Sequence, residues 1–294
     1  MKTYPILLTA ALALAGCAGT RPDVRLTSEP SIERAFDIIA SVPEGKSLMK
    51  FLRKSPVRFE YANTPGLCHK FALKSGQIFM PAGYKGSDLV LALAIARAAQ
   101  IYRLSAQSGL EEIISEEEEL GSLFQARIAL EINLVAADFA KAGGAPEIKT
   151  DFCTYVLETS RYAMAQARRE ALTADADCQR PLETLENQRV WLEKTRKAIN
   201  DETFYQLLYE RDQARVKKGS MTSSEAMKRD AAVRALPTYE VYRFQRTFYD
   251  DQNEVFKRFA RLYAAEVDRD AAWRAAHQAE IDRARTEFSD CDMR

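Results

Sequence analysis

The fold of this chain is decided by the stretch GSDLVLALAIA, residues 86–96, which is its most apolar helical segment after the first 16 residues. Ser87 and Asp88 are residue types that begin helices. The segment after them is apolar on every side of the helix, and a helix of this kind belongs in the middle of a core. We therefore expect a helix that runs to about Leu104 and is surrounded by other elements.

Two short segments before this helix predict strands. Residues 57–61 alternate apolar and polar side chains, and residues 77–80 are β-formers that end before Pro81. Two strands alone are marginally stable in water, so we expect them to belong to a small sheet packed on helices.

Helical patterns cover most of the remaining chain, which favours a mainly α protein with a small α+β part. Ser31 is expected to cap the first helix, and Pro43-Glu44-Gly45 to form a turn before the second. The expected helices cover about 32–39, 47–52, 87–104, 111–141, 152–172, 180–199, 202–217, 223–235 and 238–287.

The last of these helices carries large apolar side chains at intervals of seven residues, which form one continuous seam. The seam either packs within the chain or forms a coiled coil with a partner or a second copy. We favour antiparallel packing on the chain's own 180–217 helices, because aromatic stripes mostly fill cores and the register lasts for only about four heptads. The seam consists of Tyr242, Tyr249, Phe256 and Tyr263, together with Val241, Phe248, Val255 and Leu262.

The N-terminus indicates export. Met1-Lys2 is a short positive start, and the apolar run at 6–15 is shorter than the roughly 20 residues that span a bilayer. This pattern is typical of a secretory signal. Leu14-Ala15-Gly16-Cys17 at its end resembles the lipobox of bacterial lipoproteins, in which the cysteine is acylated and becomes the first mature residue. An ordinary signal peptide with a coincidental cysteine is the alternative.

The resemblance to the lipobox implies a protein of the bacterial envelope that is anchored in the lipid bilayer through acylated Cys17. Ala18 after the cysteine points to the outer membrane, with the protein facing the periplasm. Two or three acyl chains give stable anchoring, since each buried CH₂ contributes about 0.8 kcal/mol. Residues 17–30 then form a tether to the folded part.

The charge balance argues against a nucleic-acid partner. Removal of residues 1–16 takes away one Lys and leaves 41 Lys and Arg against 42 Asp and Glu, a net charge of −1. Binding to nucleic acid requires a clustered basic surplus. The same balance gives no reason to expect strong attraction to anionic lipid headgroups.

Four cysteines follow Cys17, and an even number in an exported protein predicts two disulfides. A helix over 152–172 would hold Cys153 and Cys178 about 30 Å apart, beyond the reach of a disulfide. We therefore favour the pairs Cys178–Cys291 and Cys68–Cys153. Metal binding by these thiols is the weaker alternative, because no Cys-x-x-Cys spacing occurs.

Residues 35–140 resemble a bacterial family described as zincin-like metallopeptidases, through the order strand, turn, strand, apolar helix and a second helix with an internal glutamate. The central helix of that family reads Leu-Ala-His-Glu-Leu-Arg-His-Ala-x-Gln. When its glutamine is matched to Gln100, Leu93 and Arg97 stand at the two metal-binding histidines, and Ala94 stands at the general-base glutamate.

The resemblance therefore implies a zincin-like fold with a degenerate active site. Such a site needs two histidines four residues apart and a glutamate that deprotonates the bound water. Glu131, near the family's third and carboxylate ligand, is the one matched residue able to coordinate a metal, and the chain has two histidines in all. We expect no catalytic residue, no metal and no cofactor.

Three further groups bear on function. The acidic run within 111–119 lacks the Asp-x-Asp-x-Asp-Gly loop of a Ca²⁺ site, and we expect a solvated start of a helix. Cys68 and His69 are neighbours in an extended segment, so their side chains point apart and do not form a nucleophile–base pair. His277 is expected at the surface.

The sequence thus predicts a signal peptide at 1–16, a tether at 17–30, a degenerate peptidase-like region at 31–145 and a long-helix region at 146–294, which packs on the preceding region or forms one domain with it. The expected function is non-catalytic binding or scaffolding in the periplasm, with a protein or the cell wall as the unidentified partner. The alternatives are a cell-wall-associated structural protein and an active metal-dependent hydrolase with a site built from Glu131, Asp138 and His69.

We predict that the substitution Cys17→Ala abolishes acylation and releases or misprocesses the protein, because the lipobox cysteine is the acyl acceptor. Fractionation of envelopes together with mass spectrometry of the N-terminal peptide measures both effects. Recovery of an acylated, membrane-bound Cys17→Ala variant would contradict the lipoprotein interpretation.

Overall fold

The apolar stretch at 86–96 begins helix α3 (Asp88–Ser108), and Ser87 caps it by accepting a hydrogen bond from the backbone N–H of Val90 at 3.4 Å. The computed structural model describes residues 25–62, 70–82, 87–141, 146–157, 183–199 and 202–288. Within these residues, α3 is long and apolar enough to cross a membrane. However, 89% of its apolar 18-residue stretch is buried inside the protein. It is a core helix, as predicted.

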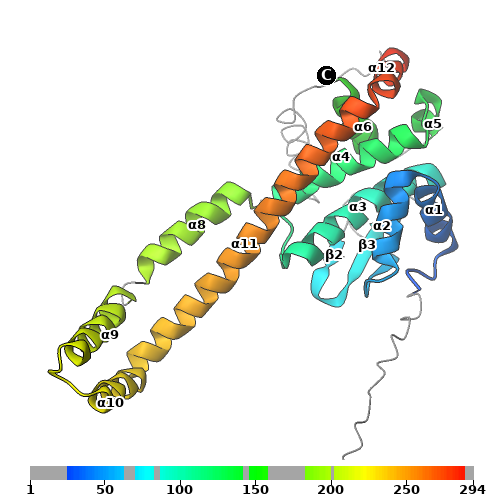
Figure 1. Ribbon diagram of the computed structural model, residues 1–294. Helices are drawn as coiled ribbons and strands as arrows, with labels where there is room; N and C mark the ends of the chain where they lie inside the picture. Colours follow the sequence, from blue (N-terminus) through cyan, green and yellow to red (C-terminus); the bar gives the residue numbers. More distant parts are fainter. Residues whose placement is uncertain are drawn as a thin grey trace, which may run out of the picture.

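Helices surround α3 to form a body (Figure 1). Helices α1 (Pro30–Ala40) and α2 (Pro43–Leu52) cover one side of it, and α4 (Ser115–Glu131) packs along another. The remaining described helices of the body are α5 (Ala136–Lys141), α6 (Pro146–Leu157) and α12 (Gln278–Glu287).

The small sheet is present and has one strand more than predicted. Strands β1 (Arg58–Ala62) and β3 (Gln77–Pro81) pair in parallel, and the unpredicted β2 (Lys70–Ala72) pairs antiparallel with β3, in the order β1-β3-β2. A one-turn 3₁₀ helix (Leu73–Ser75) links β2 to β3 and ends at Gly76, which has a positive φ of 65°. The mainly α fold with a small sheet is confirmed.

The chain leaves the body as a helical arm, which we define as α8 (Leu185–Ala198), α9 (Glu202–Lys217), α10 (Ser223–Arg234) and the first half of α11 (Pro237–Ala276). Figure 1 shows α8 and α9 running outward and α10 and α11 returning beside them. The second half of α11 then crosses the body and leads into α12.

The predicted antiparallel packing is confirmed for one part of the seam. Leu192 of α8 and Ile199 at its C-cap form a small buried cluster with Tyr249 of α11, and Tyr242 and Phe256 pack against it. Two other seam residues, Val241 and Phe248, are 58% and 44% exposed, so for them the prediction of packing within the chain is wrong. Further out, the Tyr205 hydroxyl of α9 lies 2.9 Å from the Thr238 hydroxyl, so the same pairing continues along the arm.

Some helix boundaries differ from the predicted ones. Glu29, not Ser31, occupies the N-cap of α1, because Pro30 is suited to the first helical position, and Ser31 instead hydrogen bonds the Tyr61 hydroxyl at 2.9 Å. The predicted turn at 43–45 is the first turn of α2. Gly45 allows it, since an added Cβ there would lie 1.8 Å from the backbone oxygen of Ile39.

Two long helices are also interrupted. The expected helix at 111–141 divides into α4 and α5 around Asn133, which has a φ of 56°, and the expected helix at 238–287 divides at His277. Asparagine tolerates the left-handed conformation, which explains the first interruption. The described part of the expected helix at 152–172 is α6, which begins earlier, at Pro146, and the remainder of that segment lies outside the described residues.

The second half of α11 is attached to the body by a buried ionic network. Arg127 of α4 is at its centre, with 2% of its side chain exposed, and it lies 3.6 Å from Glu44 of α2, 3.8 Å from Glu266 and 3.5 Å from Asp270 of α11. Its guanidinium also lies over the Phe124 ring at 5.4 Å. Three segments that are distant in sequence therefore meet at one cation.

Neighbouring contacts extend this network. Arg103 of α3 donates a hydrogen bond to Glu266 at 3.1 Å, and Arg269 donates one to Glu44 at 2.8 Å. The Tyr155 hydroxyl donates to Asp270 at 3.1 Å, and burial raises the pKa of that carboxyl. A network of this kind resists partial removal, because each deleted partner leaves another charge buried without compensation.

We predict that Arg127→Ala lowers the free energy of unfolding by about 3–5 kcal/mol, because it leaves three carboxylates, buried or nearly so, without their shared cation. Chemical denaturation followed by circular dichroism measures this change. The control is Arg189→Ala, which removes an arginine that also contacts two carboxylates, Glu186 and Glu193, but is exposed, and it should leave stability nearly unchanged. Equal losses in the two variants would contradict the central role of Arg127.

Candidate functional site

The positions that match the zincin motif lie in the hydrophobic core. Leu93 is 0% exposed and Ala94 is 1% exposed, so neither faces a cavity that holds water or substrate. Among the described residues, no group of three or more His, Cys, Asp or Glu side chains is placed to hold a metal ion. These positions therefore serve to pack α3 against its neighbours.

Arg97, at the position of the second metal-binding histidine, belongs to an ion-pair network. Its Nη1 lies 3.4 Å from Asp151 of α6, and its Nε lies 3.8 Å from Glu118 of α4. Ser122 donates a hydrogen bond to the same Asp151 oxygen at 3.1 Å. The basic side chain thus joins three helices of the body, and it cannot serve as a metal ligand.

Glu131 has structural partners on two other elements. It accepts hydrogen bonds from the backbone N–H of Glu44 at 3.2 Å and from the Trp273 indole N–H at 3.3 Å. Partial burial raises the pKa of its carboxyl, and these two hydrogen bonds oppose that rise. Glu131 therefore connects α4 to the start of α2 and to α11, and no hydrogen bond or ion pair described here joins it to α3.

Of the other residues of the alternative hydrolase site, the structure describes Asp138 alone. Asp138 accepts a hydrogen bond from the backbone N–H of Val135 at 3.1 Å, which stabilises the start of α5, and His69 lies outside the described residues. His277 lies partly exposed at the surface, as predicted, and its ring stacks on that of Trp273 with 4.0 Å between the centroids.

Half of the acidic run is buried, contrary to the prediction of a solvated helix start, whereas Glu111 and Glu112 are exposed. Glu117 is 0% exposed, and Glu118 and Glu119 are also buried. Glu117 accepts hydrogen bonds from the Ser105 hydroxyl at 2.6 Å and from the backbone N–H of Ile114 at 3.1 Å. Burial raises its pKa to about 8. Consecutive helical positions point in different directions, so a helix covered on several sides must bury some of them.

The predicted anchor and most of the predicted disulfide residues lie outside the described part of the chain. Cys153 is buried in α6 at 4% exposure, whereas Cys17, Cys68, Cys178 and Cys291 are not described. Acylation of Cys17 and the pairs Cys68–Cys153 and Cys178–Cys291 therefore stay predictions.

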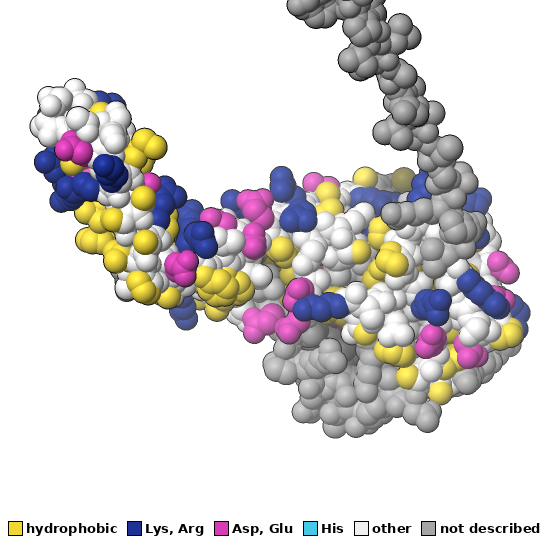
Figure 2. Space-filling view, turned by 90° about the horizontal axis from the view of Figure 1, so that it is seen from below, with side chains coloured by type: hydrophobic (Ala, Val, Ile, Leu, Met, Phe, Trp, Pro, Cys, Tyr) yellow, Lys and Arg dark blue, Asp and Glu magenta, His cyan; other side chains and the backbone are white. Residues whose placement is uncertain are grey.

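The arm carries the large exposed apolar side chains of the described structure. Figure 2 shows hydrophobic side chains gathered along it. Exposed apolar surface that is concentrated on one element is typical of an interaction site. The exposed residues are Trp191, Phe204, Leu207, Tyr209, Met227, Leu236, Val241, Phe244 and Phe248.

Four of these residues form a continuous surface, which we call the arm stripe: Trp191, Val241, Phe244 and Phe248. The last three are spaced three and four residues apart and so share one side of α11. Trp191 of α8 packs edge-on against Phe248, with 6.0 Å between ring centroids. The exposed fractions of the four side chains range from 44% to 73%.

The arm stripe leads into a groove between α8 and α11, with a volume of about 810 Å³. Trp191 and Phe248 line its outer part, and Leu110 lines it at the body. Glu111, Glu112 and Glu183 also line the groove at the body end, which makes that end acidic. The groove and the stripe together are the candidate binding surface.

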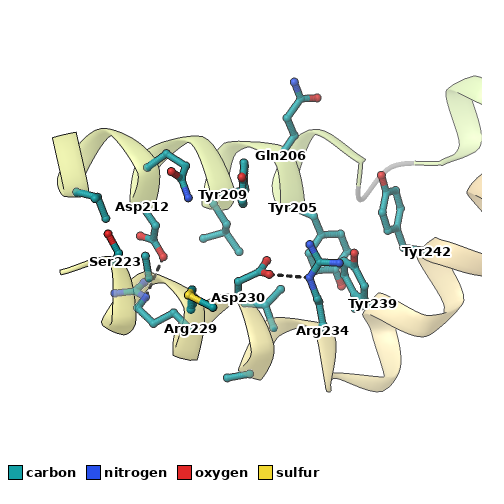
Figure 3. Close-up of a pocket in the computed structure, with 17 residues that line it drawn as sticks. Tyr205, Gln206, Tyr209, Asp212, Ser223, Arg229, Asp230, Arg234, Tyr239 and Tyr242 are labelled. Carbon is teal, nitrogen blue, oxygen red and sulfur yellow. Dashed lines mark hydrogen bonds and ion pairs between the residues drawn. The ribbon is translucent and has the colours of Figure 1, made fainter. Parts of the chain in front are cut away.

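A second hollow, of about 730 Å³, lies at the tip of the arm between α9 and α10 (Figure 3). Its charged groups already pair with one another: Asp212 lies 3.0 Å from Arg229, and Asp230 lies 2.7 Å from Arg234. Tyr205 contacts the ring of Tyr239 at 5.0 Å. Because these charged groups pair with one another, we interpret this hollow as a junction between helices rather than a prepared ligand site.

No protein-family model, curated protein or solved structure matches this chain. The functional assignment therefore depends on the residues and their geometry.

We predict that Glu117 makes stability depend on pH. Its folded pKa of about 8 lies above the ordinary value of 4.5, so its contribution is complete below about pH 4.5 and is lost as the pH rises towards and through 8. Glu117→Gln keeps an acceptor for Ile114 and Ser105 but cannot ionise. Urea unfolding at pH 5 and pH 9 should show a smaller pH-dependent loss in this variant, whereas the exposed control Glu112→Gln should behave as the wild type. A wild-type response in Glu117→Gln would contradict this assignment.

Proposed function

We propose that this protein is a non-catalytic lipoprotein of the bacterial envelope that binds or scaffolds another protein through its helical arm. The observation that carries the proposal is the arm stripe, an exposed apolar surface on a helix whose other end is held firmly by the body. Soluble proteins seldom leave such surfaces open unless a partner covers them.

The absence of catalysis is supported by the chemistry at the positions that match the zincin motif. Leu93 and Ala94 are core packing, and Arg97 is neutralised by Asp151 and Glu118. A catalytic zinc takes three protein ligands, and of the matched residues Glu131 alone can coordinate one. We propose that the body is a degenerate zincin-like domain that now serves as a support.

A supporting role fits the way in which α11 joins the two parts. The same helix contributes Glu266 and Asp270 to the buried network and Phe244 and Phe248 to the arm stripe. Glu266 follows Phe248 by 18 positions, which corresponds to about 27 Å of continuous helix. The body thus fixes the direction in which the arm stripe is presented.

The proposed anchor places this surface in the periplasm. Acylation of Cys17 would attach the protein to the outer membrane, and the tether before Leu26 would separate the body from the lipid. The predicted end of the tether at residue 30 is wrong, because Leu26 and Thr27 are buried in the body and the Phe59 backbone N–H donates a hydrogen bond to the Leu26 carbonyl at 2.7 Å. The charge balance of the mature chain makes the acyl chains, rather than electrostatic attraction, the main source of membrane affinity.

We predict that the purified protein binds no stoichiometric zinc and cleaves no peptide in a metal-dependent manner. Glu131→Ala should change stability alone, because its carboxylate accepts hydrogen bonds from Glu44 and Trp273. Metal analysis by mass spectrometry and a peptide-cleavage assay with and without chelator measure these properties. The triple variant Leu93→His, Ala94→Glu and Arg97→His is the matched converse, since it restores the ligands and the base.

The contrary result is clear. One zinc per wild-type chain that is lost in Glu131→Ala would show an active metal site and would contradict the non-catalytic proposal.

A further inference from the structure

We propose that the arm stripe is covered by the arm stripe of a second copy of this chain, with the two arms antiparallel. This inference rests on the binding role proposed above and names the partner. It follows from the exposed apolar area, the thin core of the arm and the distribution of charge along it.

The arm has too few buried residues to be complete by itself. Among the described residues of the arm, the buried apolar side chains are one cluster of Leu192, Ile199 and Tyr249, together with Tyr205, Met221 and Ala226 further out. Helix pairs of this kind usually need a further layer, and four-helix bundles supply it by packing two hairpins together. A second arm would provide this layer through the side that carries Val241, Phe244 and Phe248.

The available area matches that of a stable dimer. The four side chains of the arm stripe are 44%, 58%, 73% and 44% exposed, which corresponds to about 450 Å² of apolar surface for side chains of roughly 150–250 Å². A standard interface buries about 800 Å² per partner, of which about 57% is apolar. The arm stripe therefore supplies the apolar part of one such interface.

The arm stripe can cover itself in a symmetric dimer, with no other protein required. In a dimer with a two-fold axis, the same surface is used by both copies and must complement itself. An apolar stripe meets this condition, because it pairs equally well with an identical stripe.

The charges favour the antiparallel arrangement. The groove ends at the body beside Glu112 and Glu183, and both residues are exposed. The tip of the arm carries exposed Arg215, Lys217 and Lys218 at the end of α9. Antiparallel arms place the basic tip of each copy near the acidic rim of the other, whereas parallel arms place like charges together.

The length of the arm permits this overlap. Helices α8 and α9 contain 14 and 16 residues, which amounts to about 45 Å of helix. Full overlap of two arms therefore brings each tip to the groove of the other copy, and the arm stripe lies between these ends.

Site-specific photo-crosslinking in cells tests the proposal with the full-length protein. A photoreactive residue in place of Phe248 should link two copies, and mass spectrometry should find the link at the Val241 end of the partner's arm stripe. A link from Phe248 to Phe248 of the second copy would mean parallel arms and would overturn the arrangement. A link to a different protein would overturn self-association but would agree with the binding role, and no link at all would contradict both proposals.

Matched variants test the surface itself. Phe244→Ser should reduce the dimer yield by about tenfold or more, whereas Met227→Ser should leave it unchanged. Both residues are 73% exposed on the arm, but Met227 lines the tip hollow, which contains no residue of the arm stripe. Circular dichroism confirms that both variants fold. Equal dimer yields in the two variants would overturn the proposal.

Charge reversal tests the orientation. Arg215→Glu and Glu112→Arg should each weaken dimerisation by about fivefold, as expected for exposed ion pairs. The double variant, with both changes in one chain, should recover most of the loss, because each new acidic tip meets a new basic rim. A double variant that is weaker than either single variant would overturn the antiparallel arrangement.

Discussion

The structure depends on the burial of one guanidinium, that of Arg127, among carboxylates from elements that are far apart in sequence. Glu44 comes from the second helix of the body, and Glu266 and Asp270 come from a helix more than two hundred residues later. A buried charge without partners costs several kcal/mol, so Arg127 can be buried only where these elements come together. The network thus specifies how the last long helix docks, whereas apolar burial supplies most of the favourable free energy.

The same principle applies to the region for which a degenerate zincin-like domain is proposed. A metal site buries two histidines and a glutamate and compensates them with the ion. In this chain, Arg97 at one of these positions is compensated by Asp151 and Glu118, and the other two positions are apolar. The buried charge of Arg97 is therefore compensated by carboxylates of the protein itself. This supports the proposal that the region acts as a scaffold.

Rigid docking of α11 also explains why an apolar surface remains open on the arm. The second half of the helix is committed to the body through Glu266, Asp270 and Trp273, so the first half must project. One side of that projecting half packs on α8, and the adjoining side carries Phe244 and Phe248 into solvent. The helix thereby couples the stability of the body to the direction of the arm stripe.

The sequence by itself determined the core helix, two of the strands, most helices and the apolar periodicity of α11, because these depend on local spacing and on capping and turn residues such as Ser87 and Pro237. Only the tertiary structure decided which charges are buried. In the sequence, nothing distinguishes Glu117 and Arg127 from charged residues that face solvent. They are buried because other elements of the body surround α4. It likewise decided that Val241, Phe244 and Phe248 stay exposed, since periodicity shows that a helix has an apolar side but not how much of that side its own chain covers.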